Sequence, residues 1–560
     1  MTTTDTDRAF GPQPTTDILV IGAGLSGLVA AAEAADAGKW VTIVDQEPGA
    51  SLGGQAYWSL GGLFLIDSPE QRRMGIKDSA ELALADWLGA AAFDRPEDYW
   101  PEQWALAFVD FAAGEMRPWI KQQGISLFPI VQWAERGGYP AGGHGNTVPR
   151  FHVTWGTGPA VVTPFVRRVN EHLGTGRISL RFRHRVTALT TDGNGVTGAR
   201  GEILQPSTVE RGVPSGREVL GEFTIRAAVT IVASGGIGAN HDLVRANWPA
   251  DYGQPPQHLM SGVPDSTDGL MLGITAAAGG RLINSDRMWH YPEGIVNFAP
   301  VWTAHGIRIL PGPTSLWLDA TGKRLPPPLF PGFDAIGALR HITATGYDYS
   351  WFLLNRSILG PEFALSGSEQ NPDLTGKSVR QLVKRGLASG PTPAVQAFLD
   401  QGVDFLIADT LPELVAKMNA LTGNELIDAS ALTQLVQQRD LQVRSKLGKD
   451  PQVTATAAAR RFLGDRLMRI ADDCELLDPK SGPLIAVRLH ILTRKTLGGL
   501  ETNLSCQVLG VDGAPVGGLY AAGEAAGFGG GGVHGYRALE GTFLGGCLFS
   551  GRTAGRAAAR

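Results

Sequence analysis

The sequence has 560 residues, a formal net charge of −5 and 43% hydrophobic against 18% charged residues, a length that exceeds what one hydrophobic core usually organises and so predicts two or more domains. The acidic balance provides no basic stripe for nucleic acid, and no uninterrupted apolar run approaches the roughly 18 residues of a transmembrane helix. The three cysteines, Cys474, Cys506 and Cys547, are scattered, which predicts neither disulfides nor a metal site and favours the reducing cytoplasm.

The first structured unit follows a polar lead, residues 1–16, which is expected to be disordered. Residues 18–21 are an apolar run typical of a buried strand, and residues 25–37 are rich in alanine at helical spacing. Gly38 then ends the helix, and residues 40–44 predict a second buried strand. The unit is therefore predicted to be strand, helix, strand.

Glycines in the first turn predict a dinucleotide site. Gly22, Gly24 and Gly27 form G-x-G-x-x-G, which permits the tight turn, the approach of a pyrophosphate and close packing of helix on strand. The phosphates would rest at the positive end of the helix. Asp45 ends the second strand, where a carboxylate accepts hydrogen bonds from ribose hydroxyls and disfavours a 2′-phosphate.

A second glycine-rich loop, residues 51–64, follows this carboxylate directly. Its two Gly-Gly pairs let the backbone pass close to a flat or charged ligand, and its polar side chains add hydrogen-bonding groups. We expect a cofactor contact here rather than a plain surface loop. No histidine lies between residues 45 and 65, so a covalent histidyl link from this loop is not expected.

Residues 137–158 form a loop rich in Gly, Pro and polar residues that also holds His144, Arg150, His152 and Trp155. The loop either reaches an active site or is a linker. A helix over 159–173, a strand over 178–190 and a β-rich stretch to residue 226 are predicted to follow, and a buried strand then ends at Ser234-Gly235-Gly236.

Three motifs carry a resemblance to a known flavoprotein family. Residues 22–27, the strand end at 232–236 and GGLYAAGEAAG at 517–527 together resemble fumarate reductases, succinate dehydrogenase flavoprotein subunits and 3-ketosteroid Δ1-dehydrogenases. The resemblance covers about the first 290 and the last 70 residues. It implies non-covalent FAD, with Gly523 and Glu524 near its ribityl and phosphate groups.

The resemblance also implies the architecture, which is an α/β fold whose Rossmann-like FAD-binding domain is discontinuous, with an inserted α+β cap. The strand before Ser234 and the strand before Gly523 should then lie in one body. After the lead, the expected parts are residues 17–287 and 495–560 for the FAD-binding domain and residues 288–494 for the cap. Three helical stretches are expected between residues 378 and 473.

The motifs and the resemblance together give one set of expected FAD-binding residues. They are Gly22, Ala23, Gly24, Ser26, Gly27, Asp45, Gln46, Gly53, Gly54, Gln55, Ser59, Gly61, Gly62, Val186, Ala233, Ser234, Gly235, Gly523, Glu524, Gly541, Thr542, Phe543 and Leu544.

Polar residues at the two cap junctions are the catalytic candidates. His290 matches the family's histidine, whereas Arg494 and Lys495 stand where fumarate reductases have histidines, and Ala538 stands at their arginine position. An arginine suits an enolate or carboxylate, and a histidine or tyrosine suits proton transfer. The candidates are His290, Tyr291, Arg494, His534, Tyr536 and Arg537.

These observations predict an FAD-dependent oxidoreductase that acts on a CH–CH or C=C bond beside a carbonyl, with hydride exchanged at flavin N5. The substrate should be larger and less charged than fumarate, such as an apolar ketone or a steroid, because cap aromatics could line an apolar pocket or equally form cap core. Those aromatics are Trp289, Tyr291, Phe298, Trp302, Tyr347, Tyr349 and Trp351. The alternatives are a 3-ketosteroid dehydrogenase-like enzyme, a fumarate reductase-like enzyme for a small carboxylate, an NAD-dependent enzyme, and a flavin-binding electron carrier without turnover.

Overall fold

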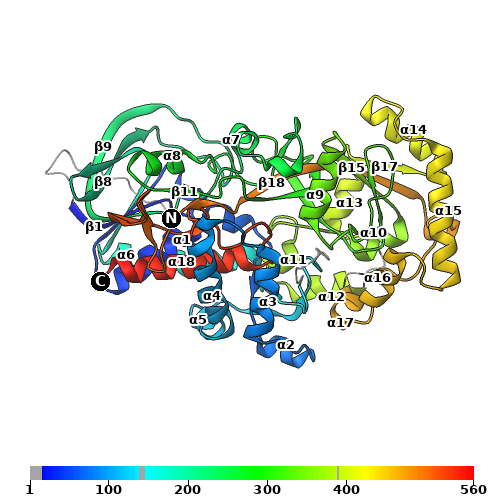
Figure 1. The fold of residues 1–560 in the computed structure, drawn as a ribbon, viewed down its shortest axis with the longest axis horizontal. Helices are drawn as coiled ribbons and strands as arrows, with labels where there is room; N and C mark the ends of the chain where they lie inside the picture. Colours follow the sequence, from blue (N-terminus) through cyan, green and yellow to red (C-terminus); the bar gives the residue numbers. More distant parts are fainter. Residues whose placement is uncertain (1–14, 138–145, 388–389, 469) are drawn as a thin grey trace.

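The computed structural model describes residues 15–137, 146–387, 390–468 and 470–560. Its elements form two halves along the long axis (Figure 1). One half holds the N-terminal and C-terminal elements, and the other holds the middle of the chain, from α9 to α17.

The N-terminal unit has the expected strand, helix and strand. They are β1 (Thr15–Ile21), α1 (Leu25–Asp36) and β2 (Val41–Asp45). The two strands are parallel, with Ile18 opposite Val41, and nine of the apolar positions from Ile18 to Ala35 are no more than 1% exposed. This burial on both faces explains the continuous apolar runs, which are typical of parallel strands covered by helices.

The central sheet brings distant parts of the chain together. Its strand order is β20–β21–β9–β1–β2–β6, and β9 also pairs with β8, which pairs with β7. The strands not yet given are β6 (Ile178–Phe182), β7 (His184–Asp192), β8 (Gly195–Leu204), β9 (Val219–Val232), β20 (Gln507–Leu509) and β21 (Pro515–Ala521). Val232 of β9 lies opposite both Ile21 of β1 and Ala521 of β21. The strands that precede Ser234 and Gly523 are therefore neighbours, as the resemblance implied.

The single strand predicted over 178–190 is wrong, because Arg183 divides it into β6 and β7. Arg183 has a left-handed backbone conformation, with φ of 60°. Its guanidinium donates hydrogen bonds to backbone oxygens of Gln46 (2.8 Å) and Gln205 (2.9 Å). These bonds compensate for a backbone conformation that L residues rarely adopt.

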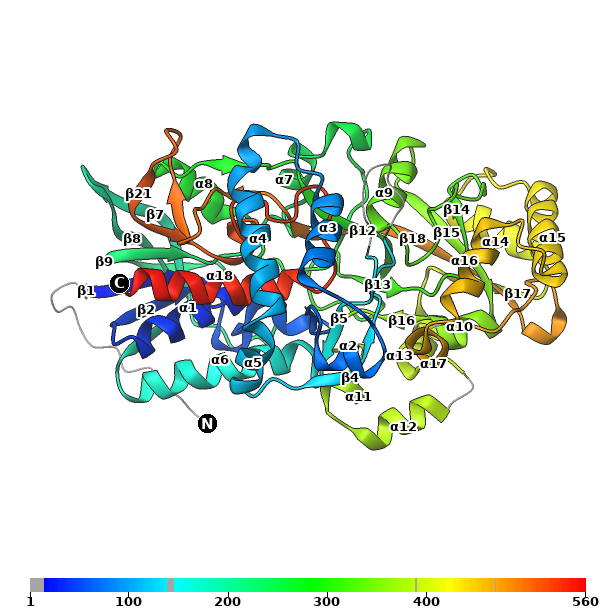
Figure 2. The ribbon, with the colours of Figure 1, turned by 60° about the horizontal axis from the view of Figure 1, so that its bottom comes forward.

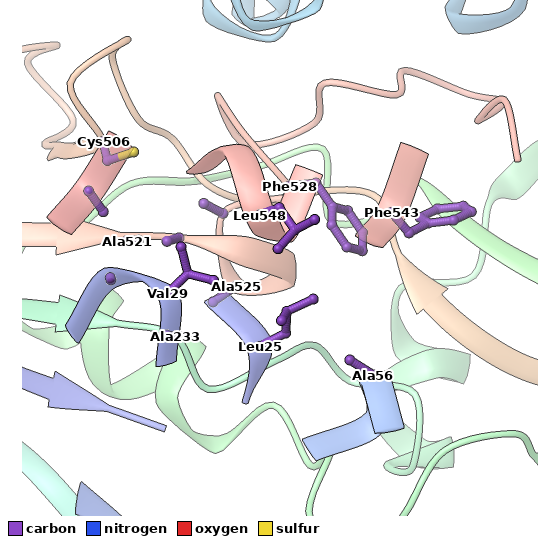
Figure 3. Close-up of a cluster of buried hydrophobic side chains, with 14 of the residues drawn as sticks. Leu25, Val29, Ala56, Ala233, Cys506, Ala521, Ala525, Phe528, Phe543 and Leu548 are labelled. Atoms are coloured by element: carbon purple, nitrogen blue, oxygen red, sulfur yellow. The ribbon is translucent and has the colours of Figure 1, made fainter. Parts of the chain in front are cut away.

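Two helices pack against each other on this sheet. The C-terminal helix α18 (Thr542–Ala558) runs beside α1 in both views (Figure 2). A Cβ atom on Gly551 would lie 2.6 Å from the Ser26 carbonyl oxygen, so glycine is what permits the close approach. Figure 3 shows the apolar cluster that results, in which Leu25 and Val29 of α1 meet Phe528, Phe543 and Leu548.

Residues 49–174 cover the same half with short helices and a small sheet. The helical elements are η1 (Gly49–Ser51), η2 (Gly54–Trp58), α2 (Pro69–Arg73), α3 (Ala80–Ala91), η3 (Pro96–Asp98), α4 (Tyr99–Ala113), α5 (Met116–Gln122) and α6 (Thr157–Gly174). The sheet has the order β3 (Gly62–Phe64), β5 (Phe151–Thr154) and β4 (Leu127–Gln132). After β9 come α7 (His241–Ala246), η4 (Ala250–Tyr252), β10 (Met260–Ser261), α8 (Leu270–Ala277) and β11 (Leu282–Ile283).

The second half is built on another sheet, with the order β14–β15–β18–β12–β13–β16, in which β10 and β17 also pair with β18. Its strands are β12 (Met288–Val296), β13 (Gly306–Leu310), β14 (Leu316–Asp319), β15 (Tyr349–Asn355), β16 (Ala364–Leu365), β17 (Phe405–Ala408) and β18 (Leu484–Thr496). Strand β18 pairs with β15 along its first seven residues and with β12 from His490 to Thr496.

Short helices surround this sheet, and the expectation of three helical stretches between residues 378 and 473 is wrong. The helices of this half are α9 (Ala335–Ala344), α10 (Arg356–Glu362), α11 (Pro372–Thr375), α12 (Val379–Leu387), α13 (Pro393–Gln401), α14 (Leu411–Thr422), α15 (Ala429–Ser445), α16 (Pro451–Ala459) and α17 (Leu463–Met468). New helices begin at three positions where a side chain caps the first turn. The capping residues are Thr392, Thr410 and Asp450, and a proline lies in the first turn of each helix. The chain ends with η5 (Pro479–Ser481), β19 (Gly499–Leu500), η6 (Gly523–Ala525) and α18.

The buried apolar residues form two clusters. One contains the central sheet with α1 and α18, and the other contains most of the second sheet, from Ile295 to Leu489. The division lies near the junctions expected at residues 288 and 494, while those boundaries themselves stay a prediction. Within the part of the chain that the structure describes, no helix combines the length and apolar character needed to cross a bilayer.

Candidate active site

One large cavity runs from the N-terminus of α1 to the junction of β12 and β18. Of the expected FAD-binding residues, the structure places nineteen in its wall: Gly22, Gly24, Ser26, Asp45, Gln46, Gly53, Gly54, Gln55, Ser59, Gly61, Gly62, Val186, Ala233, Ser234, Gly235, Glu524, Gly541, Phe543 and Leu544. The other four, Ala23, Gly27, Gly523 and Thr542, are not part of the lining.

The N-terminus of α1 faces the cavity. Gly24 precedes the helix and provides no side-chain cap, and Gly24, Leu25 and Ser26 all line the cavity. A Cβ on Gly27 would lie 2.0 Å from the Gly22 carbonyl oxygen, so glycine is required for this close turn. The first backbone amides and the positive end of a helix suit the phosphates of a dinucleotide.

Asp45 lies at the end of β2 beside this turn. Its carboxylate accepts hydrogen bonds from the backbone N–H groups of Ala23 (2.7 Å) and Glu47 (2.8 Å). Burial raises the pKa of Asp45 to about 6. Each carboxylate oxygen accepts one bond from the backbone and retains a lone pair for a ribose hydroxyl.

Glu524 lies on the opposite side of the part of the cavity lined by the expected FAD-binding residues, which is called the cofactor cradle below. It accepts a hydrogen bond from the Thr496 backbone N–H (2.9 Å) and another from the Gln55 side chain. These contacts join the second glycine-rich loop, the end of β18 and the C-terminal motif. The donors and carboxylates of this cradle fit a dinucleotide with a diphosphate and a ribose.

The other end of the cavity is lined by cationic and polar groups from β12, β13 and β18. Tyr291 and Arg494 are the two catalytic candidates that the structure brings to it, and Lys495, Arg308 and His305 line it with them. Tyr291 alternates with His290 along β12, and successive side chains of a strand point to opposite faces, which explains why Tyr291 reaches the cavity and His290 does not.

Arg494 contributes a cation to this wall. Its guanidinium forms no hydrogen bond or ion pair with any residue that the structure describes, although nearly every other buried arginine here is paired. Burial lowers its pKa, while Tyr291 and Glu369 oppose that effect. The unpaired donors are therefore available to a ligand oxygen.

His305 adds a neutral donor. Its Nδ1 accepts a hydrogen bond from the Val301 backbone N–H (3.1 Å), so in the neutral ring the proton is on Nε2. Burial lowers the pKa of His305 to about 3, with Arg494 contributing in the same direction. The ring stacks on Trp302 at 3.5 Å and lines the cavity.

A buried cluster of charged groups surrounds the Tyr291 hydroxyl. Lys495 Nζ and Glu540 Oε1 each lie 2.7 Å from it, and Arg308 donates to the same Glu540 oxygen at 2.8 Å. Burial lowers the pKa of Lys495 to about 7. Burial and the neighbouring Glu540 raise the pKa of Tyr291 well above its ordinary value, so Tyr291 keeps its proton at neutral pH.

Four of the six catalytic candidates lie outside the cavity, each for a visible reason. His290 is buried, accepts the Arg494 backbone N–H (3.1 Å) and stacks near Trp248. His534 bonds to Thr542 Oγ1 (2.8 Å) among aromatic rings. Tyr536 donates to Asp94 (3.0 Å), and Arg537 reaches Asp334 (3.4 Å).

Two further predictions from the sequence concern this cavity, namely the aromatic residues of an apolar pocket and the loop of residues 137–158. Of the seven aromatics considered for an apolar pocket, Tyr291 and Trp302 line it, whereas Trp289 and Trp351 are buried in the packing of the two halves. In the loop of residues 137–158, Arg150 pairs with Asp78 and Asp86 and His152 bonds to Ser68, away from the lining. His144 lies outside the described residues.

Sequence reasoning missed Glu540 and His305 as site residues. Glu540 follows Ala538 and Leu539 and precedes a glycine, and a lone carboxylate among apolar and small residues was the signal, because such residues are rarely buried unless paired. His305 had no comparable signal, since it is placed by the turn between β12 and β13.

Comparisons with known proteins agree with this geometry. Residues 17–544 match the family model of the FAD binding domain. A KsdD-like steroid dehydrogenase of Mycobacterium tuberculosis is 62% identical over 547 residues, which cover 97% of this chain and 96% of that protein.

Two solved structures share the fold. The 3-ketosteroid Δ1-dehydrogenase of Sterolibacterium denitrificans, in complex with 1,4-androstadiene-3,17-dione, has a TM-score of 0.68 at 17% identity over 97% of this chain and 99% of that chain. The 3-ketosteroid-Δ4-(5α)-dehydrogenase of Rhodococcus jostii, in complex with 4-androstene-3,17-dione, has a TM-score of 0.63 at 21% identity over 100% of this chain and 98% of that chain. The fold predicted from the sequence is thus confirmed, and FAD is the cofactor.

Proposed function

Because this chain belongs to the FAD binding domain family and is an FAD-dependent oxidoreductase, we propose that it oxidises or reduces a CH–CH or C=C bond beside the carbonyl of a steroid-like ketone. The observation that carries the proposal is that the unpaired guanidinium of Arg494 and the hydroxyl of Tyr291 line the same cavity as the residues expected to bind FAD. The relative named a KsdD-like steroid dehydrogenase supports the substrate class.

The residues divide the chemistry between them. When bound, FAD supplies the hydride acceptor or donor. Arg494, with the Nε2–H of His305, holds the carbonyl oxygen and stabilises the negative charge that develops on it as the α-proton leaves. Tyr291 exchanges that α-proton, because its hydroxyl lies at the substrate end of the cavity and is held between a donor, Lys495, and an acceptor, Glu540. These roles replace those expected for His290, Tyr536 and Arg537.

The same proposal assigns the cofactor contacts and the parts of the chain. The nineteen lining residues named above hold FAD non-covalently, the parts 17–287 and 495–560 form its domain, and 288–494 form the cap. The three described cysteines are free thiols, which supports the cytoplasm as the compartment.

The test is anaerobic mixing of the yellow holoprotein with a panel of 3-ketosteroids, simple ketones and fumarate, followed by flavin absorbance. We expect a 3-ketosteroid to bleach the flavin. Arg494→Met should lower the rate of bleaching ~10²–10³-fold, the scale of one lost oxyanion donor, while the bound FAD per chain is unchanged. Arg494→Lys should recover part of the rate, because lysine keeps the positive charge but lacks the paired N–H donors of the planar guanidinium.

The panel also separates the alternatives. Bleaching by fumarate or another small carboxylate alone would replace the ketone proposal by a carboxylate enzyme, for which an unpaired arginine is equally suited. If the protein contains flavin and no member of the panel bleaches it, the proposed activity is contradicted, and the electron-carrier alternative remains.

A further inference from the structure

The hydroxyl of Tyr291 has a fixed hydrogen-bond direction. Lys495 Nζ and Glu540 Oε1 each lie 2.7 Å from it. An ammonium group has donors and no acceptor, whereas an ionised carboxylate has acceptors and no donor. The Tyr291 oxygen therefore accepts from Lys495 and directs its own proton to Glu540.

Glu540 differs from the other carboxylates around Arg308. Glu135 and Glu293 lie 2.9 Å and 3.5 Å from the guanidinium, and burial raises the pKa of both despite Arg308. For Glu540, burial acts in the same direction, but Lys495, Arg308 and the hydrogen bond from Tyr291 oppose it, and the pKa of Glu540 is lowered. Glu540 is thus ionised at neutral pH, and it lines the cavity.

We propose that Glu540 is the terminal acceptor of the substrate's α-proton, reached through Tyr291. In dehydrogenation the α C–H bond breaks and its electron pair enters the new C=C bond as hydride leaves the β-carbon for the cofactor. The α-proton goes to the Tyr291 oxygen, and the proton of Tyr291 goes to Glu540 Oε1. In the reductive direction both protons move back. This inference rests on the proposed function.

Lys495 and Arg308 are positioning residues in this scheme. Lys495 orients the Tyr291 hydroxyl and also lies 3.8 Å from the centre of the Phe543 ring. Arg308 fixes the Glu540 carboxylate, and its guanidinium carbon lies 3.5 Å from the centre of the Tyr291 ring. Glu540 itself is only 10% exposed, so the proton it receives is shielded from bulk water during the reaction.

The decisive variant is Glu540→Gln, and its readout is independent of flavin reduction. A saturated 3-ketosteroid deuterated at its α-carbons is incubated with the oxidised holoprotein, and loss of deuterium to water is followed by mass spectrometry. Glutamine keeps an acceptor for the Tyr291 proton but cannot take that proton, so we expect washout to fall ~10²-fold or more, as for one lost acid–base group. Substrate KM should change little.

Glu293→Gln is the matched control. Glu293 contacts the same Arg308, is more deeply buried than Glu540 and does not line the cavity. Its replacement should leave washout within about 3-fold of the natural protein, which corresponds to less than ~1 kcal/mol at 1.4 kcal/mol per tenfold. Equal washout in the Glu540→Gln and Glu293→Gln proteins would overturn the proposal.

A double substitution tests whether Tyr291 and Glu540 act in one path. Tyr291→Phe should abolish washout, and adding Glu540→Gln should lower it no further, because residues that act as a unit are not additive. Additive losses would contradict the proposed path. Should the Glu540→Gln protein lack FAD, Glu540→Asp keeps the carboxylate and should retain more washout than Glu540→Ala; the reverse order would overturn the proposal.

These outcomes are distinct from failure of the proposed function. If no ketosteroid bleaches the flavin of the natural protein, the activity itself is wrong. If the natural protein is bleached and Glu540→Gln retains full washout, the activity stands and the proton acceptor is another group.

Discussion

At the scale of single residues, cofactor affinity should depend strongly on Asp45. Its carboxylate fixes the backbone of Ala23 and Glu47 and lines the cavity. Asp45→Ala removes these bonds and those to a ribose, so FAD affinity should fall by ~1–3 kcal/mol, the range for charged hydrogen bonds. Titration of apoprotein with FAD measures it. Asp17→Ala, which removes a carboxylate from the same sheet at an exposed Trp40 N–H, should leave affinity unchanged.

Lys495 should set the alkaline limit of activity. Burial lowers its pKa to about 7, while Glu540 and Glu524 oppose that shift and Arg494 and Arg308 add to it. The protonated amine holds Tyr291, so kcat/KM should be high below pH 7 and fall as the pH rises through that value. In the Lys495→Arg protein, this fall of kcat/KM should occur well above pH 7, because arginine stays charged.

The pH profile of kcat/KM with the best ketosteroid checks this expectation. Lys384→Arg, at an exposed position of α12, should reproduce the profile of the natural protein. A limb near pH 7 that persists in the Lys495→Arg protein would show that another group causes it.

At the scale of elements, the contact between α1 and α18 requires glycine. A Cβ on Gly551 would lie 2.6 Å from the Ser26 oxygen and 3.1 Å from its Cα, and backbone atoms cannot turn away as a side chain can. Gly551→Ala should therefore lower the free energy of unfolding by ~1–3 kcal/mol through overpacking. Urea unfolding measures the change.

Gly273 of α8 is the matched glycine with the opposite expectation. A Cβ there meets no atom within 4 Å, so alanine should stabilise the helix by ~0.5–1 kcal/mol through its better helix propensity. Destabilisation by both alanines to the same extent would mean that the loss at Gly551 does not arise from the helix contact.

Sequence patterns identified the elements whose signals are local. The strand, turn and helix at residues 15–36 follow from an apolar run, three glycines and alanine spacing, and β9 beside β21 followed from a motif shared with a family. The break at Arg183 could not be predicted, because its partners are backbone oxygens distant in sequence. The same reason hid Glu540, whose role depends on Arg308 and Lys495 from two other strands.

The candidate catalytic residues show the same limit. The sequence brought attention to both cap junctions, but it could not tell which neighbour on a strand faces inward. Tyr291 and His290 are adjacent, and only the pairing of β12 with β18, with its register shifts around Tyr291, decides that Tyr291 faces the cavity.

At the scale of the whole molecule, the two halves have separate apolar cores and share one long strand. Strand β18 pairs with β15 and β17 in the second half over its first residues, and its last residues, Arg494 to Thr496, belong to the cavity and to the contact with Glu524. Polar site residues therefore lie where two cores meet, which is a common position for ligand sites.

This shared strand has a mechanical consequence. If the second half rotates against the first to admit a substrate, β18 must twist along its length, and Arg494 and Lys495 turn with it while Glu524 and the flavin cradle stay behind. Arg494, which holds the ketone, and Lys495, which orients Tyr291, would then move away from their catalytic positions together. The motion that opens the entrance would therefore also separate the catalytic residues from the flavin. The bound flavin would then exchange hydride only when the two halves are closed on a substrate.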